Sequence, residues 1–90
     1  MGSTVGLVVR VMPTGVDVDM KTLAEKAREA MPKDAKLRGM QVRDIAFGLK
    51  ALLISVHIPD TGGLQEQVEK ALQGVPHVES VEVIDTTLVQ

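Results

Sequence analysis

The sequence contains no cysteine, tryptophan or tyrosine, and Phe47 is its single aromatic residue. The lack of cysteine excludes disulfides, thiolate metal sites and cysteine-based catalysis. With one aromatic side chain, the protein also lacks the stacking surface on which single-stranded nucleic acids bind. Ten basic and twelve acidic residues give a formal net charge of -2, without the positive surplus that phosphate-backbone binding requires. We therefore expect no direct contact with nucleic acid.

Long apolar runs and targeting signals are missing as well. No apolar segment approaches the roughly 18 residues of a membrane span, and the N-terminus lacks the basic segment of a secretory signal. The chain has 90 residues, of which 44% are hydrophobic and 24% charged, enough for one hydrophobic core. The sequence thus predicts a single domain over residues 1–90, located in the cytoplasm and away from membranes.

Motifs for catalysis or cofactor binding are not found. His57 falls in a strand pattern and His77 in a loop, and neither has acidic residues at the spacing of a metal site. Gly62-Gly63 precedes a helix pattern, but neither GxxxxGK[ST] nor GxGxxG is present, so a turn is the favoured interpretation. We expect a protein that is not an enzyme and holds neither metal nor cofactor.

Hydrophobic periodicity predicts two helices and four strands, in the order strand 5–12, helix 20–31, strand 35–49, strand 52–58, helix 64–75 and strand 78–84. Asp19 is expected to cap the first helix and Pro32 to end it. The second strand is expected to bulge near Gly39 or Asp44. The last strand should fray over residues 86–90.

This order of elements, β-α-β-β-α-β, predicts a ferredoxin-like α+β fold with a four-stranded antiparallel sheet and both helices on one face. The helix-free face should carry Val8, Met12, Leu53 and Ser55. We expect that face to be solvated, covered by a partner or buried in an oligomer.

Phe47 and Gly48 stand where the second and third strands meet, in a predicted tight hairpin at Phe47–Lys50. Two interpretations of the lone aromatic remain open. It is either an anchor of the hydrophobic core or an exposed contact for a partner protein.

Three segments resemble the archaeal elongation factor 1-beta family: VVRVMP with VDVDMKTLAEK (8–26), IAFGLKALLI (45–54) and VESVEVID (78–85). The resemblance extends over nearly the whole chain. It implies a translation elongation factor that acts as a guanine-nucleotide exchange factor. Its partner would be the GTPase elongation factor 1-alpha, from which it releases GDP so that GTP can rebind during polypeptide chain elongation. Nucleotide and magnesium would belong to that partner.

The resemblance also implies the residues of contact. In eukaryotic relatives, an aromatic residue of a Phe-Gly motif contacts the GTPase, and a lysine near the C-terminus points toward its magnesium site. Phe47-Gly48 matches the aromatic motif, but no basic residue follows Lys70. Either Lys50 replaces the missing lysine, or magnesium is dislodged indirectly by displacement of the partner's loops. The expected partner-binding residues are Phe47, Gly48, Lys50, Thr87 and Leu88.

An alternative function comes from a different class of protein. A ferredoxin-like regulatory module of the ACT type binds a small effector between subunits, and a glycine-bearing turn beside a helix-free sheet face suits that role. An enzyme is disfavoured, because no pair of acid-base or nucleophilic residues can be assembled.

Overall fold

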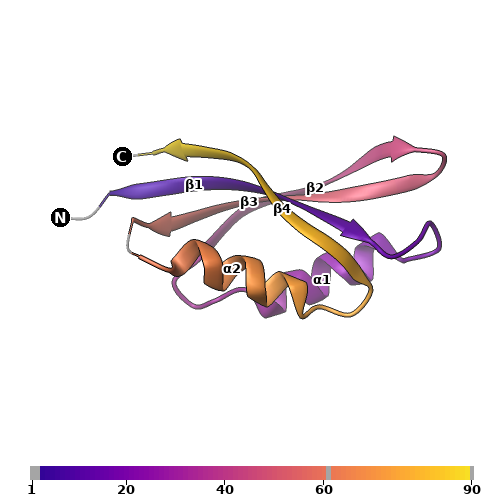
Figure 1. The fold of residues 1–90 in the computed structure, drawn as a ribbon, viewed down its shortest axis with the longest axis horizontal. Helices are drawn as coiled ribbons and strands as arrows, with labels where there is room; N and C mark the ends of the chain where they lie inside the picture. Colours follow the sequence, from indigo (N-terminus) through magenta and orange to yellow (C-terminus); the bar gives the residue numbers. More distant parts are fainter. Residues whose placement is uncertain (1–2, 61, 90) are drawn as a thin grey trace.

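A computed structural model of the chain describes residues 3–60 and 62–89. Its elements are β1 (Thr4–Pro13), α1 (Met20–Ala30), β2 (Lys36–Ala46), β3 (Leu49–Pro59), α2 (Leu64–Gln73) and β4 (Val78–Leu88). The four strands form one antiparallel sheet in the order β2-β3-β1-β4. Both helices lie against the same face of this sheet (Figure 1). The predicted ferredoxin-like α+β fold is confirmed.

The two helices begin and end close to the predicted residues. The Asp19 carboxylate caps α1 by accepting hydrogen bonds from the Lys21 backbone N–H at 3.1 Å and from the Thr22 hydroxyl at 3.0 Å. Helix α2 follows Gly63, whose φ of 87° places it in the left-handed region, and its C-cap is Gly74. With 11 and 10 residues, neither described helix is long and apolar enough to cross a membrane.

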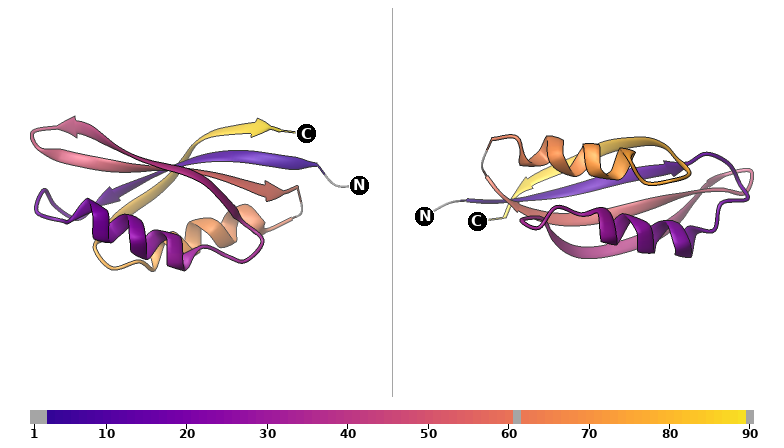
Figure 2. Two further views of the ribbon diagram at one scale, coloured as in Figure 1. Left: turned by 180° about the vertical axis from the view of Figure 1, so that it is seen from behind. Right: turned by 90° about the horizontal axis from the view of Figure 1, so that it is seen from below.

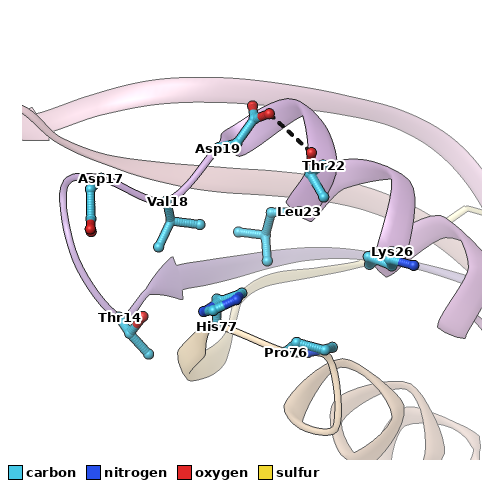
Figure 3. A pocket seen from close by; sticks show the side chains of 9 residues that line it. All are labelled: Thr14, Asp17, Val18, Asp19, Thr22, Leu23, Lys26, Pro76 and His77. Carbon is cyan, nitrogen blue, oxygen red and sulfur yellow. Dashed lines mark hydrogen bonds between the residues drawn. The ribbon is translucent and has the colours of Figure 1, made fainter.

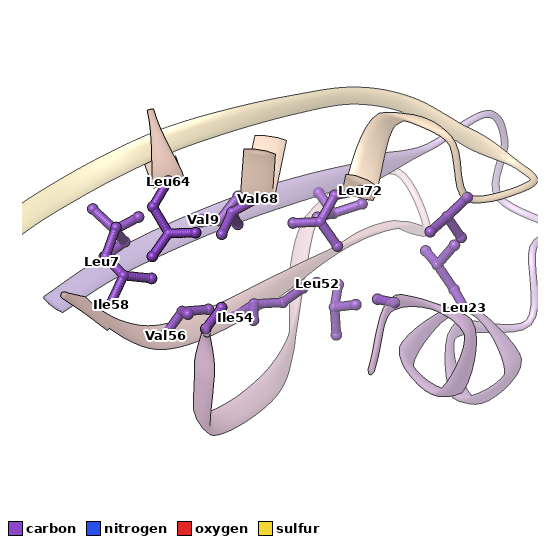
Figure 4. Close-up of a cluster of buried hydrophobic side chains, with 14 residues drawn as sticks. Leu7, Val9, Leu23, Leu52, Ile54, Val56, Ile58, Leu64, Val68 and Leu72 are labelled. Carbon is purple, nitrogen blue, oxygen red and sulfur yellow. The ribbon is translucent and has the colours of Figure 1, made fainter. Parts of the chain in front are cut away.

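The hydrophobic core fills the space between the sheet and the helices (Figure 4). The period-two pattern of β1 and β3 is confirmed, because alternate residues of both strands point into this layer. The helices contribute the apolar faces that their sequence periodicity predicts. The largest fully buried side chains are Leu7, Val9, Val11, Leu52, Ile54, Val56, Val68 and Leu72.

Both edge strands contain β-bulges. In β2 the register against β3 shifts between Leu37 and Gly39 and again between Asp44 and Ala46, which confirms the predicted bulge. In β4 the register against β1 shifts twice, and the residues passed over are Glu79 and Ile84. A one-residue bulge reverses the side-chain alternation beyond it. These shifts therefore decide which face of the sheet each charged residue of β2 and β4 occupies.

The predicted fraying of the C-terminal segment is wrong for residues 86–89. Strand β4 runs to Leu88, pairing Thr86, Thr87 and Leu88 with Leu7, Gly6 and Val5. The Val89 N–H then donates to the Thr4 carbonyl at 2.8 Å. The polar threonines favour this pairing because their side chains are β-branched. Gln90 lies outside the described residues.

The molecule is elongated, with principal extents of 45 × 21 × 17 Å. At one end lie the β1–α1 loop, the β2–β3 hairpin and the α2–β4 loop; this is the hairpin end. At the other lie the start of β1 and the end of β4, the tail end (Figures 1 and 2). The predicted contact residues are divided between these two ends.

Candidate functional site

The β2–β3 hairpin closes through a two-residue turn. Ala46 pairs with Leu49, so the turn residues are Phe47 and Gly48, one position earlier than the predicted hairpin at Phe47–Lys50. Their φ angles are 50° and 82°, and a positive φ at both residues is typical of a type I′ turn. Glycine adopts this conformation freely, whereas an L side chain there costs roughly 1–2 kcal/mol.

Phe47 projects from this turn into solvent, with an exposed fraction of 103%. The interpretation of Phe47 as a core anchor is therefore wrong. Neither the backbone preference of phenylalanine nor any packing within the fold favours an aromatic residue here. An unfavourable backbone conformation that holds an exposed aromatic side chain points to a contact outside the chain.

Phe47 is one of four large apolar residues with exposed side chains at the hairpin end, and we call these four residues the hairpin patch. They are Val16 (65% exposed), Val42 (48%), Ile45 (46%) and Phe47. Val16 lies close to the hairpin, because the β1–α1 loop and residues of the hairpin enclose a cleft of about 280 Å³. Sequence reasoning did not identify the other three. Ile45 is the residue passed over at the second bulge of β2. Strand alternation in the sequence therefore does not predict on which face of the sheet its side chain lies.

Lys50 lies on the same hairpin, exposed and opposite Asp44 in the β2–β3 pairing. Together with Lys21 it lines the cleft beside the β1–α1 loop. The one ion pair among residues 3–60 and 62–89 joins Arg10 to Glu82. Lys50 thus contributes a positive charge beside the hairpin patch.

A second cavity, of about 460 Å³, opens between the β1–α1 loop, the start of α1 and the α2–β4 loop (Figure 3). Its two loops are tied by a hydrogen bond from the Thr14 N–H to the His77 carbonyl at 2.9 Å. His77 has a φ of 69°. The Thr22 hydroxyl, and next the Lys21 N–H, hold the pKa of Asp19 below its ordinary value. Within the described part of the chain, no three His, Cys, Asp or Glu residues are placed to share a metal ion.

Thr87 and Leu88 do not join the hairpin residues. Leu88 is 69% exposed at the tail end and lies level with Ile58, because both pair with Val5. From Leu49 to Ile58, at ~3.3 Å per residue, β3 spans about 30 Å. The predicted site is therefore two surfaces at opposite ends, and Lys50 cannot place a charge where the tail ends.

Comparison with known families identifies the kind of protein to which this geometry belongs. Residues 6–89 match the EF-1 guanine nucleotide exchange domain. The chain belongs to this family. It is 47% identical to the elongation factor 1-beta of Halorubrum lacusprofundi over 83% of this chain and 85% of that protein. It is 39% identical to the elongation factor 1-beta of Methanoregula boonei over 98% of this chain and 99% of that protein. The function expected from the resemblance, guanine-nucleotide exchange in translation elongation, is confirmed, and these relatives are archaeal.

Solved structures of other proteins share the fold. The ACT domain from the GTP pyrophosphokinase of Chlorobium tepidum superimposes with a TM-score of 0.63 and 14% identity, covering 93% of this chain and 100% of that domain. The C-terminal domain of MgtC from Mycobacterium tuberculosis superimposes with a TM-score of 0.53 and 15% identity. The match covers 96% of this chain and 86% of that domain. At such low identity these likenesses show the fold alone. They lend no support to effector binding, the alternative function.

Proposed function

We propose that the chain binds elongation factor 1-alpha through the hairpin patch and the tail end, and thereby promotes release of GDP. The observation that carries this proposal is Phe47, a fully exposed aromatic side chain held on a turn with positive φ. Aromatic residues are the commonest energetic centres of protein interfaces. Because the turn already fixes the Phe47 backbone, little backbone conformational entropy remains to be lost there when the complex forms.

Exchange requires differential affinity for two states of the partner. The chain must bind the nucleotide-free GTPase more tightly than the GDP-bound form, because only that difference shifts the equilibrium toward release. Contacts about 30 Å apart, estimated from strand length, suit this task. A partner held at both ends can be strained in the region between them.

The tail end carries Thr87, Leu88 and Val89, which are exposed and uncharged. We infer that this end acts by displacing loops around the partner's magnesium ion, since the segment after Lys70 contains no lysine that could compete with the ion for its anionic ligands. Lys50 assists at the hairpin end. In this proposal the chain makes and breaks no covalent bond, so it is not an enzyme. It holds no cofactor, needs no nucleic acid or membrane, and works in the cytoplasm.

The test is release of labelled GDP from the cognate elongation factor 1-alpha, with the wild-type chain, Phe47→Ala and Ile84→Ala. Ile84 is 46% exposed, like Ile45, but lies on β4 away from the hairpin. Phe47→Ala should slow the stimulated release about 30-fold, corresponding to ~2 kcal/mol of lost contact. Its urea midpoint should stay unchanged, and Ile84→Ala should behave like the wild type.

Two results would contradict the proposal at different levels. Normal stimulation by Phe47→Ala would exclude the hairpin patch as the contact, while leaving exchange activity intact. Tight binding of GDP to the isolated chain, measured by calorimetry, would contradict the assignment of the nucleotide site to the partner.

A further inference from the structure

The face of the sheet that carries no helix is a separate surface, which we call the open face. Its centre is formed by the residues of β1 and β3 that alternate with the buried ones, and Val8, Met12, Leu53 and Ser55 are all half-buried there, as the sequence predicts. It contains a shallow groove of about 480 Å³. Gly39 leaves one side of the groove open, since a Cβ at this position would meet nothing within 4 Å.

The bulge at Arg38 gathers the positive charges of β2 onto the open face. Leu37 and Met40 both pack against the core although they are three residues apart, because the register shifts between them. Lys36 and Arg38 therefore point to the same side as Arg43. In a regular strand, Arg43 would face the opposite way from the other two.

The bulge at Ile84 brings the negative charges of β4 onto the open face. Val81 and Val83 pack against the core, and beyond the bulge the core-facing position passes to Thr86, which pairs with the buried Leu7. Glu82 and Asp85 consequently share the open face. Without the bulge, Asp85 would point toward the helices.

The open face thus has a basic edge along β2 and an acidic edge along β4. Glu82 is already paired with Arg10, the single ion pair of the described ranges. The charges of Lys36, Arg38 and Arg43 on one edge, and of Asp85 on the other, are therefore not neutralised by ion pairs within residues 3–60 and 62–89. Two edges of opposite sign flanking a half-buried centre are complementary to a second copy of the same face.

We propose that two copies of this chain associate through their open faces. A twofold axis parallel to the strands lays β2 of each copy over β4 of the other, so that basic and acidic edges meet. A twofold axis in the sheet plane but perpendicular to the strands would lay β2 over β2, and like charges would repel. The charge arrangement therefore selects the first orientation.

The strand register identifies the charges that meet. Gly39 and Val8 both pair with Ser55, and Val8 also pairs with Asp85. Arg38, the bulge residue beside Gly39, is therefore level with Asp85 at the other edge of the sheet. In the proposed dimer, Arg38 of each copy lies over Asp85 of the other, and this contact occurs twice.

The size of the face limits the strength of association. Over the eight residue pairs that join β1 and β3, four strands ~4.8 Å apart present about 500 Å² from each copy. The total of about 1,000 Å² is at the lower limit for a specific protein interface. We therefore expect a weak dimer that forms at high protein concentration and dissociates as salt screens the edge charges.

Sedimentation equilibrium of the full chain tests the proposal, up to about 1 mM protein in low salt, about 0.05 M. Arg38→Glu and Asp85→Lys should each weaken dimerisation about ten- to one-hundredfold, because two attractive contacts become repulsive. An equimolar mixture of the two variants should dimerise like the wild type, since each Arg38–Asp85 contact is then either the original or the reversed pair. Lys21→Glu and Glu25→Lys, on α1, are the matched controls and should not change association.

Urea midpoints of all variants establish that each is folded before association is compared. A wild-type chain that stays monomeric over the whole concentration range would overturn the proposal. So would a mixture of Arg38→Glu and Asp85→Lys that remains monomeric. If the wild type is monomeric and Arg38→Glu nevertheless slows GDP release, the GTPase covers the open face instead of a second copy.

Discussion

The hairpin end and the tail end both expose apolar side chains, but the two ends differ in how these side chains relate to the fold. Phe47 projects from a turn whose backbone conformation is unfavourable, and its side chain is fully exposed. Leu88 is also exposed, yet its backbone continues the β1–β4 ladder. Exposure alone therefore does not separate a residue that serves binding only from one that also stabilises the fold. The backbone conformation and pairing of each residue separate the two.

This difference has a practical consequence for experiments on function. At the hairpin tip, binding and stability can be changed independently, because Phe47 contributes nothing to packing. At the tail end they cannot, because Thr87 and Leu88 hold the first residues of β1 in place. A loss of exchange caused by a tail variant must therefore be compared with its loss of stability.

Deletion of residues 87–90 should give the largest change in stability. It removes the pairing partners of Gly6 and Val5 and the hydrogen bond from the Val89 N–H to the Thr4 carbonyl. At ~1 kcal/mol per hydrogen bond, the free energy of unfolding should fall by about 2–3 kcal/mol. Urea unfolding measures the loss, and GDP release should be assayed at low temperature, where the shortened chain is folded. An unchanged midpoint would mean that this part of the ladder is frayed in solution.

Phe47→Asn should have the opposite effect on the fold. Asparagine favours the first position of a type I′ turn, so the free energy of unfolding should rise by about 1 kcal/mol, while GDP release slows as in Phe47→Ala. Gly48→Ala is the matched control. Its φ of 82° with open space around the Cβ position means that backbone strain alone should destabilise this variant, by about 1 kcal/mol. If Phe47→Asn destabilises the chain, the phenylalanine has a structural role.

The two ends also differ in what the sequence predicts. The order of elements, the Asp19 cap and the β2 bulge follow from local patterns, and the structure has all three. The extent of β4 does not follow, because Thr86 and Thr87 are ordered by pairing with β1, more than 75 residues away in the sequence. The sequence also does not determine whether Phe47 is exposed, since an aromatic residue beside a glycine is compatible with both a core position and a hairpin tip.

Lys50→Ala should have a smaller effect than either change at Phe47. Because Lys50 is exposed beside the hairpin patch, and about 30 Å from the tail end by strand length, its charge should speed association rather than hold the complex. We expect GDP release to slow a few-fold in low salt, with the difference disappearing as salt rises. Lys33→Ala, in the α1–β2 loop, is the matched control. Complete loss of exchange in Lys50→Ala would instead mean that Lys50 performs the role of the lysine found near the C-terminus of the eukaryotic relatives.

The smallest expected effect concerns Asp19, whose carboxylate supports the loop beside the hairpin patch. Hydrogen bonds from the Thr22 hydroxyl, and next from the Lys21 N–H, lower the pKa of Asp19 from its ordinary value of 3.8. The charged carboxylate thus stabilises the folded state above 3.8, and this contribution is lost as pH falls through the lower pKa of the folded protein. Asp19→Asn should therefore differ from the wild type in urea midpoint at neutral pH and converge with it in acid. Thr22→Val, which removes the largest cause of the shift, should begin to lose stability at a higher pH than the wild type does. A difference between Asp19→Asn and the wild type that stays constant down to acid pH would show that the charge of this cap does not contribute to stability.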